Sequence, residues 1–394
     1  MKKNINDFDF LNKFVLLRLD LNVPLKNGKI ESSKRIDEAL PTIRALIEKG
    51  AKVTIVSHLG KPDGKVVDEL SLQPVYEYLK EKLNNNVYFS KNIANEEMYE
   101  EVKKLNQGEV LLLENIRFYK GEEENDDEFS KNLAKPFDIF ILDAFGTSHR
   151  KHASTYGVAK YLDSGLGLLV EKELGYLEDI FVTSKHPIVA ILGGAKVKDK
   201  LKVIDNLLDK VDVLIIGGGM SYSFIKALKG EVGKSLVDDE QIDYCFNMIK
   251  KAINNKVKLL LPVDSICSES INGEIVKYQT LAKMDKSLMG LDIGYKTIKL
   301  FKKHIKKAKT IIINGPMGVF ENEKFSVGTK EILKAIVNNK KAVKVAGGGD
   351  TILAIEKNDL VYGFNHLSTG GGVSLKLLEG NGLVAINNLS NKGE

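Results

Sequence analysis

Short hydrophobic runs alternate along the chain with stretches in which apolar residues recur at helical spacing. Such runs lie within residues 13–25, 51–60, 86–90, 109–118 and 137–146 of the first half, and within residues 186–194, 211–219, 257–266, 309–318 and 342–350 of the second half. Amphipathic patterns such as those of residues 33–50 and 72–83 separate them. Continuous Val, Ile and Leu runs suit strands that are covered on both faces, and the intervening helices suit parallel crossovers. The pattern therefore predicts an α/β protein with two doubly wound, parallel-sheet (Rossmann-like) domains.

The length of the chain agrees with two domains, because 394 residues would fill two of ordinary size. The segment "GLLVEKELGYLEDIF", residues 167–181, has a helical pattern and is predicted to form the hinge that joins them. The acidic segment "GEEENDDEF", residues 121–129, is interpreted as the start of a solvated helix rather than as a site.

Charge and hydropathy argue against several classes of protein. The net charge is only +5, and the lysines are spread along the chain instead of forming a basic arm for nucleic acid. Cys245 and Cys267 are too few and too far apart for a disulfide framework or a zinc site, so buried thiols in a reducing compartment are expected. The N-terminal segment has acidic residues where a signal peptide has its apolar core, and no apolar run approaches the ~18 residues of a membrane span. We therefore expect a cytoplasmic protein without nucleic-acid or membrane partners.

Polar residues follow the predicted strands of the first half, whereas glycines follow those of the second half. Ligands of open α/β sheets bind beyond the carboxyl ends of the strands, so residues at these positions are candidate site residues. In the first half they are Asp20, Asn22, His58, Lys61, Arg117, His149 and Arg150. In the second half they are the segments "GGAK" (193–196), "GGGM" (217–220), "NGPMG" (314–318), "GGGD" (347–350) and "STGGGVS" (368–374).

Glycines at a strand-to-helix turn let a ligand approach the backbone, and the helix N-terminus offers free N–H donors to an anion. Several such turns in one half favour a ligand that carries phosphate. The half contains no G-x-G-x-x-G, and "GKS" at residues 233–235 lacks the upstream glycine of a P-loop, so the pattern is not a known nucleotide fingerprint. Asp350, in "GGGDT", is a single carboxylate of the kind that shares Mg²⁺ with nucleotide phosphates.

Arginine is rare in this lysine-rich chain, and every arginine lies in the first 150 residues. Its planar fork grips carboxylate or phosphate with two hydrogen bonds, which lysine cannot do. Arg35, Arg117 and Arg150 fall in or beside predicted loops and are candidates for anion binding. Arg18 lies inside a strand pattern, where a structural ion pair is expected, and Arg44 is expected on a helix surface. Together with "DAFGTSHRKHAST", residues 143–155, the three loop arginines predict one wall of a site for a small, multiply charged anion.

A cationic half and a glycine-rich half suit phosphoryl transfer between a small acidic substrate and a nucleotide. That reaction needs positioning and charge neutralisation rather than a protein nucleophile, and the sequence has no nucleophile motif. Two other classes remain open at this point. A two-domain dehydrogenase would also have glycine turns, but it would need a dinucleotide fingerprint. A non-catalytic anion-binding or scaffold protein would explain the cationic half alone.

The motifs resemble those of the phosphoglycerate kinase family, in the family's order and over nearly the whole chain. They are "RLDLNVPL" (18–25), "SHLGKPDG" (57–64), "LLLENIRF" (111–118), "DAFGTSHRKHAST" (143–155), "ILGGAKVKDKLKVIDNLL" (191–208), "IIGGGMSYSF" (215–224), "NGPMGVFE" (314–321), "VAGGGDT" (345–351) and "HLSTGGGVSLKLLEG" (366–380). The resemblance implies reversible, direct in-line transfer of the 1-phosphate of 1,3-bisphosphoglycerate to Mg-ADP, with domain closure. It also implies 3-phosphoglycerate and ATP as products, Mg²⁺ as the cofactor and a monomer as the default.

The resemblance further implies a role for particular residues. The glycerate would be bound by Asp20, Leu21, Asn22, Arg35, His58, Leu59, Gly60, Lys61, Arg117, His149 and Arg150. The nucleotide would be bound by Gly193, Lys196, Lys200, Gly217, Gly218, Gly290, Asn314, Glu321, Gly348, Gly349, Asp350 and Thr351, with Asp350 on the metal. The implied catalytic groups are Arg35, Lys196, Lys200, Gly371 and Gly372.

The resemblance implies an N-terminal glycerate-binding domain of residues 1–168 and a C-terminal nucleotide-binding domain of residues 182–375. An interdomain helix at residues 169–181 would join them, and the tail of residues 376–394 would pack back on the first domain. The chain departs from the family's common residues at three positions. Lys61 replaces an arginine, Tyr295 replaces a proline near the turn at Gly290, and Ile313 replaces a tryptophan.

Overall fold

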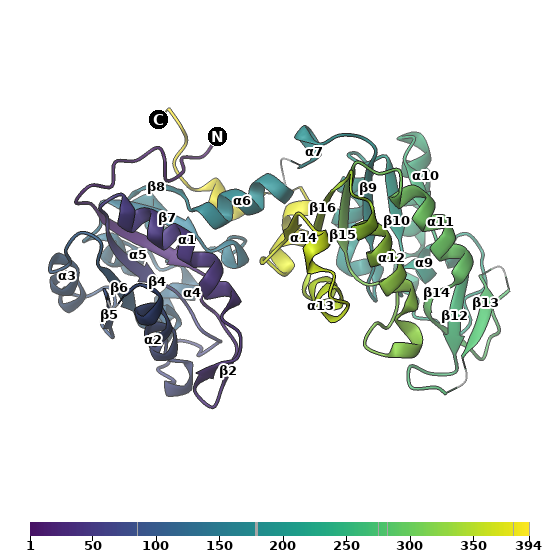
Figure 1. Cartoon of the computed structure of the whole chain (residues 1–394), viewed down its shortest axis with the longest axis horizontal. Helices are drawn as coiled ribbons and strands as arrows, with labels where there is room; N and C mark the ends of the chain where they lie inside the picture. The colour runs from purple at the N-terminus through teal and green to yellow at the C-terminus, as the bar shows by residue number, and fades with distance from the viewer. Residues whose placement is uncertain (85, 178–179, 275, 282, 381, 394) are drawn as a thin grey trace. The chain divides into compact units, whose positions relative to one another are not determined.

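The computed structural model describes residues 1–84, 86–177, 180–274, 276–281, 283–380 and 382–393. The chain divides into two compact units, one of Met1–Leu174 with Gly382–Glu394 and one of Gly175–Asn381 (Figure 1). Each unit contains a six-stranded parallel sheet, so the α/β class with two parallel-sheet domains is confirmed.

The sheet of the first unit has the strand order β5-β6-β4-β1-β7-β8, and its strand pairs are parallel. Its strands are β1 (Phe14–Leu19), β4 (Lys52–Val56), β5 (Val87–Ser90), β6 (Val110–Leu113), β7 (Ile139–Asp143) and β8 (Asp163–Leu166). Its helices are α1 (Lys34–Glu48), α2 (Gln73–Lys82), α3 (Glu96–Lys103), α4 (Lys120–Glu124), α5 (Asp127–Ala134) and α15 (Val384–Asn387). A short hairpin of β2 (Leu25–Lys26) and β3 (Lys29–Ile30) precedes α1.

Burial on both faces explains the continuous hydrophobic runs of this sheet. Every residue of β6 and β7 is buried, and α1 contributes Ile36, Leu40, Ile43 and Leu46 to the same core. The polar residues at the carboxyl ends of the strands therefore begin where a fully apolar core ends.

The sheet of the second unit has the strand order β11-β10-β9-β15-β16-β17 and is also parallel. Its strands are β9 (Ile188–Leu192), β10 (Val213–Ile216), β11 (Lys258–Leu260), β15 (Thr310–Asn314), β16 (Val343–Gly347) and β17 (His366–Leu367). The helices of this unit are α7 (Ile180–Thr183), α8 (Leu201–Leu207), α9 (Ser221–Ala227), α10 (Ile242–Asn254), α11 (Tyr295–Ile305), α12 (Val327–Asn338), α13 (Gly349–Lys357) and α14 (Gly372–Leu378).

One predicted strand, within residues 257–266, is in fact two strands of different sheets. β11 ends at Leu260, and Pro262, which has no amide donor, follows before β12 (Asp264–Ser268). β12 is the central strand of a separate antiparallel sheet with β13 (Lys277–Thr280) and β14 (Met289–Ile293). The hydrophobic pattern does not reveal this small sheet, because β13 is mostly exposed.

The predicted hinge helix, residues 169–181, corresponds to α6 (Leu168–Leu177) and the first residues of α7, while residues 178–179 lie outside the described chain. At the start of α6, the amide of Val170 donates to Oδ1 of Asp143 at 3.0 Å. Burial raises the pKa of Asp143 to about 6, and hydrogen bonds from Thr42 and from the α6 backbone oppose that rise. The carboxylate at the end of β7 thus caps the first turn of α6.

The C-terminal segment returns to the first unit, and the two chain ends lie side by side (Figure 1). The amide of Lys3 donates to the carbonyl of Ser390 at 3.0 Å, and the amide of Ala385 donates to the carbonyl of Ser148 at 3.0 Å. In the two-unit division of the chain, the returning segment begins at Gly382, whereas the resemblance implied a tail that begins at residue 376. The reason is that α14 packs on α8, where Asn206 Nδ2 donates to Leu378 O at 2.7 Å.

Both cysteines are buried and free, as predicted. Burial raises the pKa of Cys245 to about 12 and that of Cys267 to about 11, which is opposite to the shift of a reactive thiol. Among the helices in the described ranges, none combines the length and the apolar character needed to cross a bilayer.

Candidate active site

Loops from four neighbouring strands of the first sheet, β6, β4, β1 and β7, meet at its carboxyl edge. Asn22, after β1, accepts a hydrogen bond at Oδ1 from the amide of Gly60, after β4, at 3.0 Å. Arg117, after β6, donates from Nη1 to the carbonyl of Gly60 at 2.7 Å. The predicted residues of these loops therefore form one connected network.

Arg35 joins this network from α1, of which it is the second residue. Its Nη1 donates to Oδ1 of Asp20 at 2.9 Å, and 38% of its side chain remains exposed. The carboxylate orients the guanidinium group and leaves part of its fork accessible to an anion.

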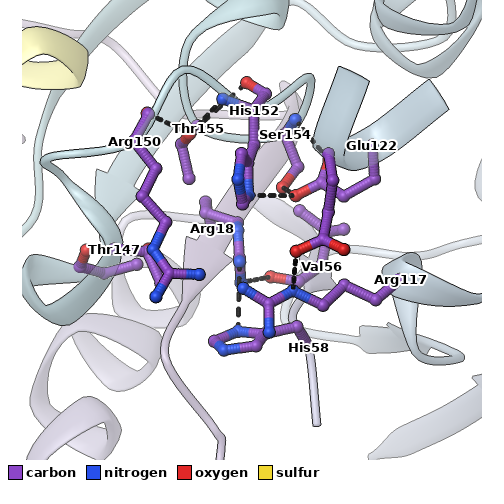
Figure 2. Close-up of polar contacts among 12 residues, drawn as sticks. Arg18, Val56, His58, Arg117, Glu122, Thr147, Arg150, His152, Ser154 and Thr155 are labelled. Carbon is purple, nitrogen blue, oxygen red and sulfur yellow. Dashed lines mark hydrogen bonds and ion pairs between the residues drawn. The ribbon is translucent and has the colours of Figure 1, made fainter. Parts of the chain in front are cut away.

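A cluster of cationic and imidazole groups lies beside this network. Figure 2 shows Arg18, His58, Arg117, Arg150 and His152 turned toward one another. Burial, and after it the charges of the neighbouring arginines, holds the pKa of His58 well below its usual range and lowers that of His152 to about 4. Both imidazoles are therefore neutral near pH 7, and the guanidinium groups carry the charge of this cationic wall.

Among the residues that the structure describes, Arg18 has no carboxylate within ion-pair distance, in contrast to the structural ion pair expected from the strand pattern. It is fully buried in β1 and donates to the carbonyls of Leu19 and Val56, the latter at 3.3 Å, while its Nη2 lies 3.3 Å from Nδ1 of His58. Burial lowers the pKa of Arg18, and the charge of Glu122 opposes this effect. Arg18 is thus a member of the cationic wall that sequence reasoning did not include.

The acidic segment 121–129 is only partly the solvated helix start that the sequence suggests. α4 and α5 do begin there, but Glu122 is fully buried, and its carboxylate points into the cationic wall (Figure 2). Glu123 reaches the same wall, with Oε1 at 3.4 Å from Nε of Arg117. The interpretation of this segment as solvated is therefore wrong for Glu122, and Glu123, although partly exposed, lies beside the wall as well.

The other predicted first-half residues differ in accessibility. Leu21 and Leu59 are buried, and their amides already donate to Ser57 Oγ at 2.9 Å and to Asn115 Oδ1 at 3.2 Å. Leu21 and Leu59 therefore stabilise the loops of the network and are not placed to contact a ligand directly. Lys61 and Lys151 are exposed, and Arg44 is exposed as predicted. His149 accepts a hydrogen bond at Nε2 from Nε of Arg150 at 3.3 Å.

Two adjoining cavities open at the carboxyl edge of the second sheet. The first, of about 250 Å³, is lined mainly by apolar groups that include Tyr222, Met289 and Leu291, with Glu321 at its border. The second, of about 350 Å³, is lined by polar groups that include Lys196, Lys200, Asn314, Thr351 and the glycines 348, 349, 371 and 372. The cavities share Gly194, Ala195, Pro316 and Asp350. An apolar compartment beside a polar, cationic one suits a planar ring system that carries anionic groups.

Lys200 is the buried cation of the polar cavity. Its Nζ donates to Gly193 O at 2.7 Å, to Asn314 O at 2.9 Å and to Asn314 Oδ1 at 2.7 Å. Burial lowers its pKa to about 8, while the charges of Asp350 and Asp199 oppose this shift. Lys196, by contrast, is exposed.

The predicted glycines serve two different purposes. A side chain would overlap neighbouring protein atoms at four of them, namely Gly193, Gly217, Gly218 and Gly290. These glycines allow close packing of the loops, and Gly290 in particular makes room for Tyr222 and Ser265. Open space faces three others, Gly349, Gly371 and Gly372, where a ligand can approach the backbone. Gly348 and Gly371 also have φ angles of +91° and +54°, which favour glycine.

Asp350 is an exposed carboxylate in the first turn of α13, and it borders both cavities. The neighbouring Thr351 is buried and accepts from the amide of Gly315 at 2.7 Å, so its hydroxyl connects two loops. Within the described ranges, no three His, Cys, Asp or Glu side chains gather into a protein-only metal site. One carboxylate beside an anion cavity fits a magnesium ion that takes its remaining ligands from phosphate and water.

Sequence reasoning named Gly218, Gly290, Glu321 and Asp350 of the apolar cavity but missed the apolar and aromatic side chains that line it. Tyr222 follows the "GGGM" turn, and its hydroxyl lies 2.7 Å from Ser265 Oγ. Met289 and Leu291 belong to β14, a strand of the unpredicted antiparallel sheet. The only signal was the position of Tyr222 directly after a predicted glycine turn.

The comparisons with known proteins agree with one another. The family model described as phosphoglycerate kinase matches residues 5–381. The phosphoglycerate kinase of Dictyoglomus turgidum is 47% identical over 99% of this chain and 98% of that protein, and that of Pseudothermotoga lettingae is 46% identical over the full length of both. The solved structure of phosphoglycerate kinase from Coxiella burnetii superposes with a TM-score of 0.93 at 40% identity, covering all of both chains. The structure from Pyrococcus horikoshii OT3 gives 0.79 at 35% identity over 98% of each. The chain belongs to the phosphoglycerate kinase family.

Proposed function

We propose that the carboxyl edge of the first sheet binds 3-phosphoglycerate or 1,3-bisphosphoglycerate, and that the two cavities of the second sheet bind ADP or ATP. The family assigns phosphoglycerate kinase activity in glycolysis to the chain. The observation that carries the site assignment is the division of chemistry, with a guanidinium-rich wall on one unit and glycine-lined cavities on the other.

On the first unit, the phosphate and carboxylate of the glycerate would meet the guanidinium groups of Arg35, Arg117 and Arg150. Nη2 of Arg117 is buried and has no hydrogen-bond partner within the described chain, whereas its Nε already faces Glu123 Oε1 at 3.4 Å, so the free hydrogen-bonding capacity of the group is at Nη2. Asp20 and Asn22 would orient the network through their bonds to Arg35 and Gly60. The remaining proposed contacts are His58, Leu59, Gly60, Lys61, Leu21 and His149.

On the second unit, the apolar cavity would hold the base and the polar cavity would hold the phosphates. Glu321, at the border of the apolar cavity, would contact a ribose hydroxyl. Lys196, Lys200 and the exposed amides of Gly371 and Gly372 would face the transferring phosphoryl group. The other proposed nucleotide residues are Gly193, Gly217, Gly218, Gly290, Asn314, Gly348, Gly349, Asp350 and Thr351.

The reaction itself needs no protein nucleophile, because the acyl phosphate is already activated. Arg35, Lys200 and backbone amides would spread the charge of the moving phosphoryl group, and in-line transfer would follow from correct positioning. Since each unit would hold one substrate, we propose that the units close during turnover, which also excludes water. A cytoplasmic monomer, the family default, stays a prediction.

The proposed magnesium ligand is Asp350. A bound Mg²⁺ would neutralise phosphate charge and orient the nucleotide. The single exposed carboxylate fits this role, because Mg²⁺ in such sites takes most of its ligands from phosphate oxygens and water.

A coupled assay that follows ATP formation from ADP and 1,3-bisphosphoglycerate tests the function directly. We expect turnover that depends on Mg²⁺, and saturation by both substrates. A chain that binds 3-phosphoglycerate but produces no ATP would instead be the non-catalytic anion-binding protein considered from the sequence. Reduction of a nicotinamide cofactor without ATP formation would indicate a dehydrogenase.

Asp350→Asn is expected to weaken binding of Mg-ADP by about tenfold or more, the scale for removing a side chain that supports a bound metal. Binding of ADP without Mg²⁺ should not weaken, because the carboxylate only repels bare phosphates. Calorimetry of ADP binding with and without Mg²⁺ measures both affinities. The charge-matched control is Asp359→Asn, which removes an exposed carboxylate just after the end of α13. An equal loss with and without metal would show that Asp350 is no magnesium ligand.

A further inference from the structure

A carboxylate is buried behind the cationic wall, where it cannot touch a substrate. Glu122, in α4, is fully buried, and both of its carboxylate oxygens accept hydrogen bonds from Ser154. Oε2 accepts from the Ser154 amide at 2.8 Å, and Oε1 accepts from the Ser154 hydroxyl at 2.7 Å. The carbonyl of Glu122 also accepts from the amide of Ala153 at 2.9 Å. Three hydrogen bonds therefore fasten residues 153–154 to α4.

The charge of Glu122 is surrounded by the groups of the wall. Its Oε1 lies 3.7 Å from Nδ1 of His152, which comes from the segment it fastens. Burial raises the pKa of Glu122, while the charges of Arg18 and Arg117 and the bonds from Ser154 oppose the rise. The charges of Arg18 and Arg117 and the two hydrogen bonds from Ser154 thus all favour the ionised carboxylate.

The fastened segment carries part of the proposed glycerate site. Residues 149–155 form a tight turn in which Thr155 Oγ1 donates to Arg150 O at 3.2 Å and the amide of Arg150 donates to Thr147 O at 3.0 Å. These bonds make the segment compact, and the bonds from Ser154 connect it to Glu122 of α4 (Figure 2). The amide of Ala153 adds a third connection to α4. A displacement of Ser154 would therefore carry Arg150 with it.

We propose that Glu122 is a positioning residue of the phosphoglycerate site, which holds Arg150 and its segment in place through Ser154. The proposal rests on the assignment of 3-phosphoglycerate to the first unit. A positioning role and a purely electrostatic role of Glu122 predict opposite changes in the affinity for the anionic substrate when the charge is removed. Removing a negative charge from behind a cationic wall strengthens attraction of an anion, whereas releasing Arg150 weakens it.

Glu122→Gln separates these two effects, because glutamine has almost the same size without the charge. Its amide oxygen can still accept from the Ser154 amide, but its NH₂ group cannot accept from the Ser154 hydroxyl, which would have to reverse and accept instead, and neither hydrogen bond would then involve a charged carboxylate. We expect the KM for 3-phosphoglycerate to rise about tenfold, the scale for losing a hydrogen bond to a charged group, and the KM for Mg-ATP to stay within about twofold. The matched control is Glu124→Gln, which removes the same charge from an exposed position of the same helix.

Steady-state kinetics in the ATP-consuming direction, together with thermal unfolding of each variant, decide the matter. A lower KM for 3-phosphoglycerate in Glu122→Gln, or an unchanged KM with a lower unfolding temperature, would overturn the positioning role. If Glu122→Gln does not fold, Ser154→Ala gives the same test, since it removes one of the three bonds and retains the charge. A rise of about threefold in the same KM is then expected, and no rise would overturn the proposal. A wild-type protein that consumes no ATP with 3-phosphoglycerate would refute the proposed function instead.

Discussion

Arg35→Ala is expected to lower kcat by on the order of 10³-fold to 10⁵-fold, the effect of an arginine that neutralises a transferring phosphoryl group. The KM for 3-phosphoglycerate should change far less, because Arg117 and Arg150 remain to bind the ground state. The structure favours this role, since Arg35 is oriented by Asp20 at 2.9 Å while 38% of its side chain stays exposed.

Two further variants sharpen the test of Arg35. Arg35→Lys retains the charge but not the planar fork, so its kcat should also be severely reduced. Arg44→Ala removes an exposed arginine from the same helix and should have no effect on kcat. Steady-state kinetics of the three variants give the answer. If Arg35→Ala raises KM while kcat stays near the wild-type value, Arg35 is an anchor and not a catalytic residue.

Lys200→Met is expected to lower kcat by about 10²-fold to 10³-fold, the cost of removing one positioned donor from a transition state. It would also leave Asn314 Oδ1 and two carbonyls without their donor, so unfolding of the variant must be measured in parallel. Lys198→Met, an exposed lysine of the same turn, is the control. A folded Lys200→Met variant with wild-type kcat would exclude Lys200 from the reaction.

The pH dependence of the wild-type enzyme gives an independent measure of Lys200. Burial lowers its pKa to about 8, so the free enzyme carries the charge below that pH and loses it above. We therefore expect kcat/KM for Mg-ATP, which reports on the free enzyme, to decline above about pH 8. In Lys200→Arg the decline should disappear, whatever the absolute rate, because a guanidinium group stays charged. A decline that persists in this variant belongs to another group.

The sequence predicted the central parallel strands well because they are buried on both faces, whereas the edge strands β8 and β17 fall outside the predicted runs. A strand such as β7 is buried along its whole length and is polar only at its last residue, Asp143, so nothing interrupts its hydrophobic run. The predicted loop residues also lie together, because parallel neighbours end at the same edge. Asn22, Gly60 and Arg117 are far apart in the chain yet form one hydrogen-bonded network.

The remaining features depend on contacts that local patterns cannot encode. Glu122 stands among solvated acids, and nothing in its neighbours along the chain shows that Ser154 will cover it. Gly193 and Gly349 look alike in sequence, but one packs against Pro316 and the other faces open space. The apolar cavity of the second unit is lined in part by β14. The antiparallel sheet of β14 has one exposed strand, β13, and therefore gives a weak hydrophobic signal in the sequence.

The return of the chain to its first unit has a consequence for synthesis on the ribosome. The second unit is continuous, so all of its residues have emerged before the segment from Gly382 onward. The first unit, although translated first, still lacks Ala385, Ile386 and Leu389, all of which are buried in the finished protein. N-terminal domains usually complete their folding first during translation, but here the N-terminal unit can be completed only after the whole second unit has been synthesised and the returning segment has left the ribosome.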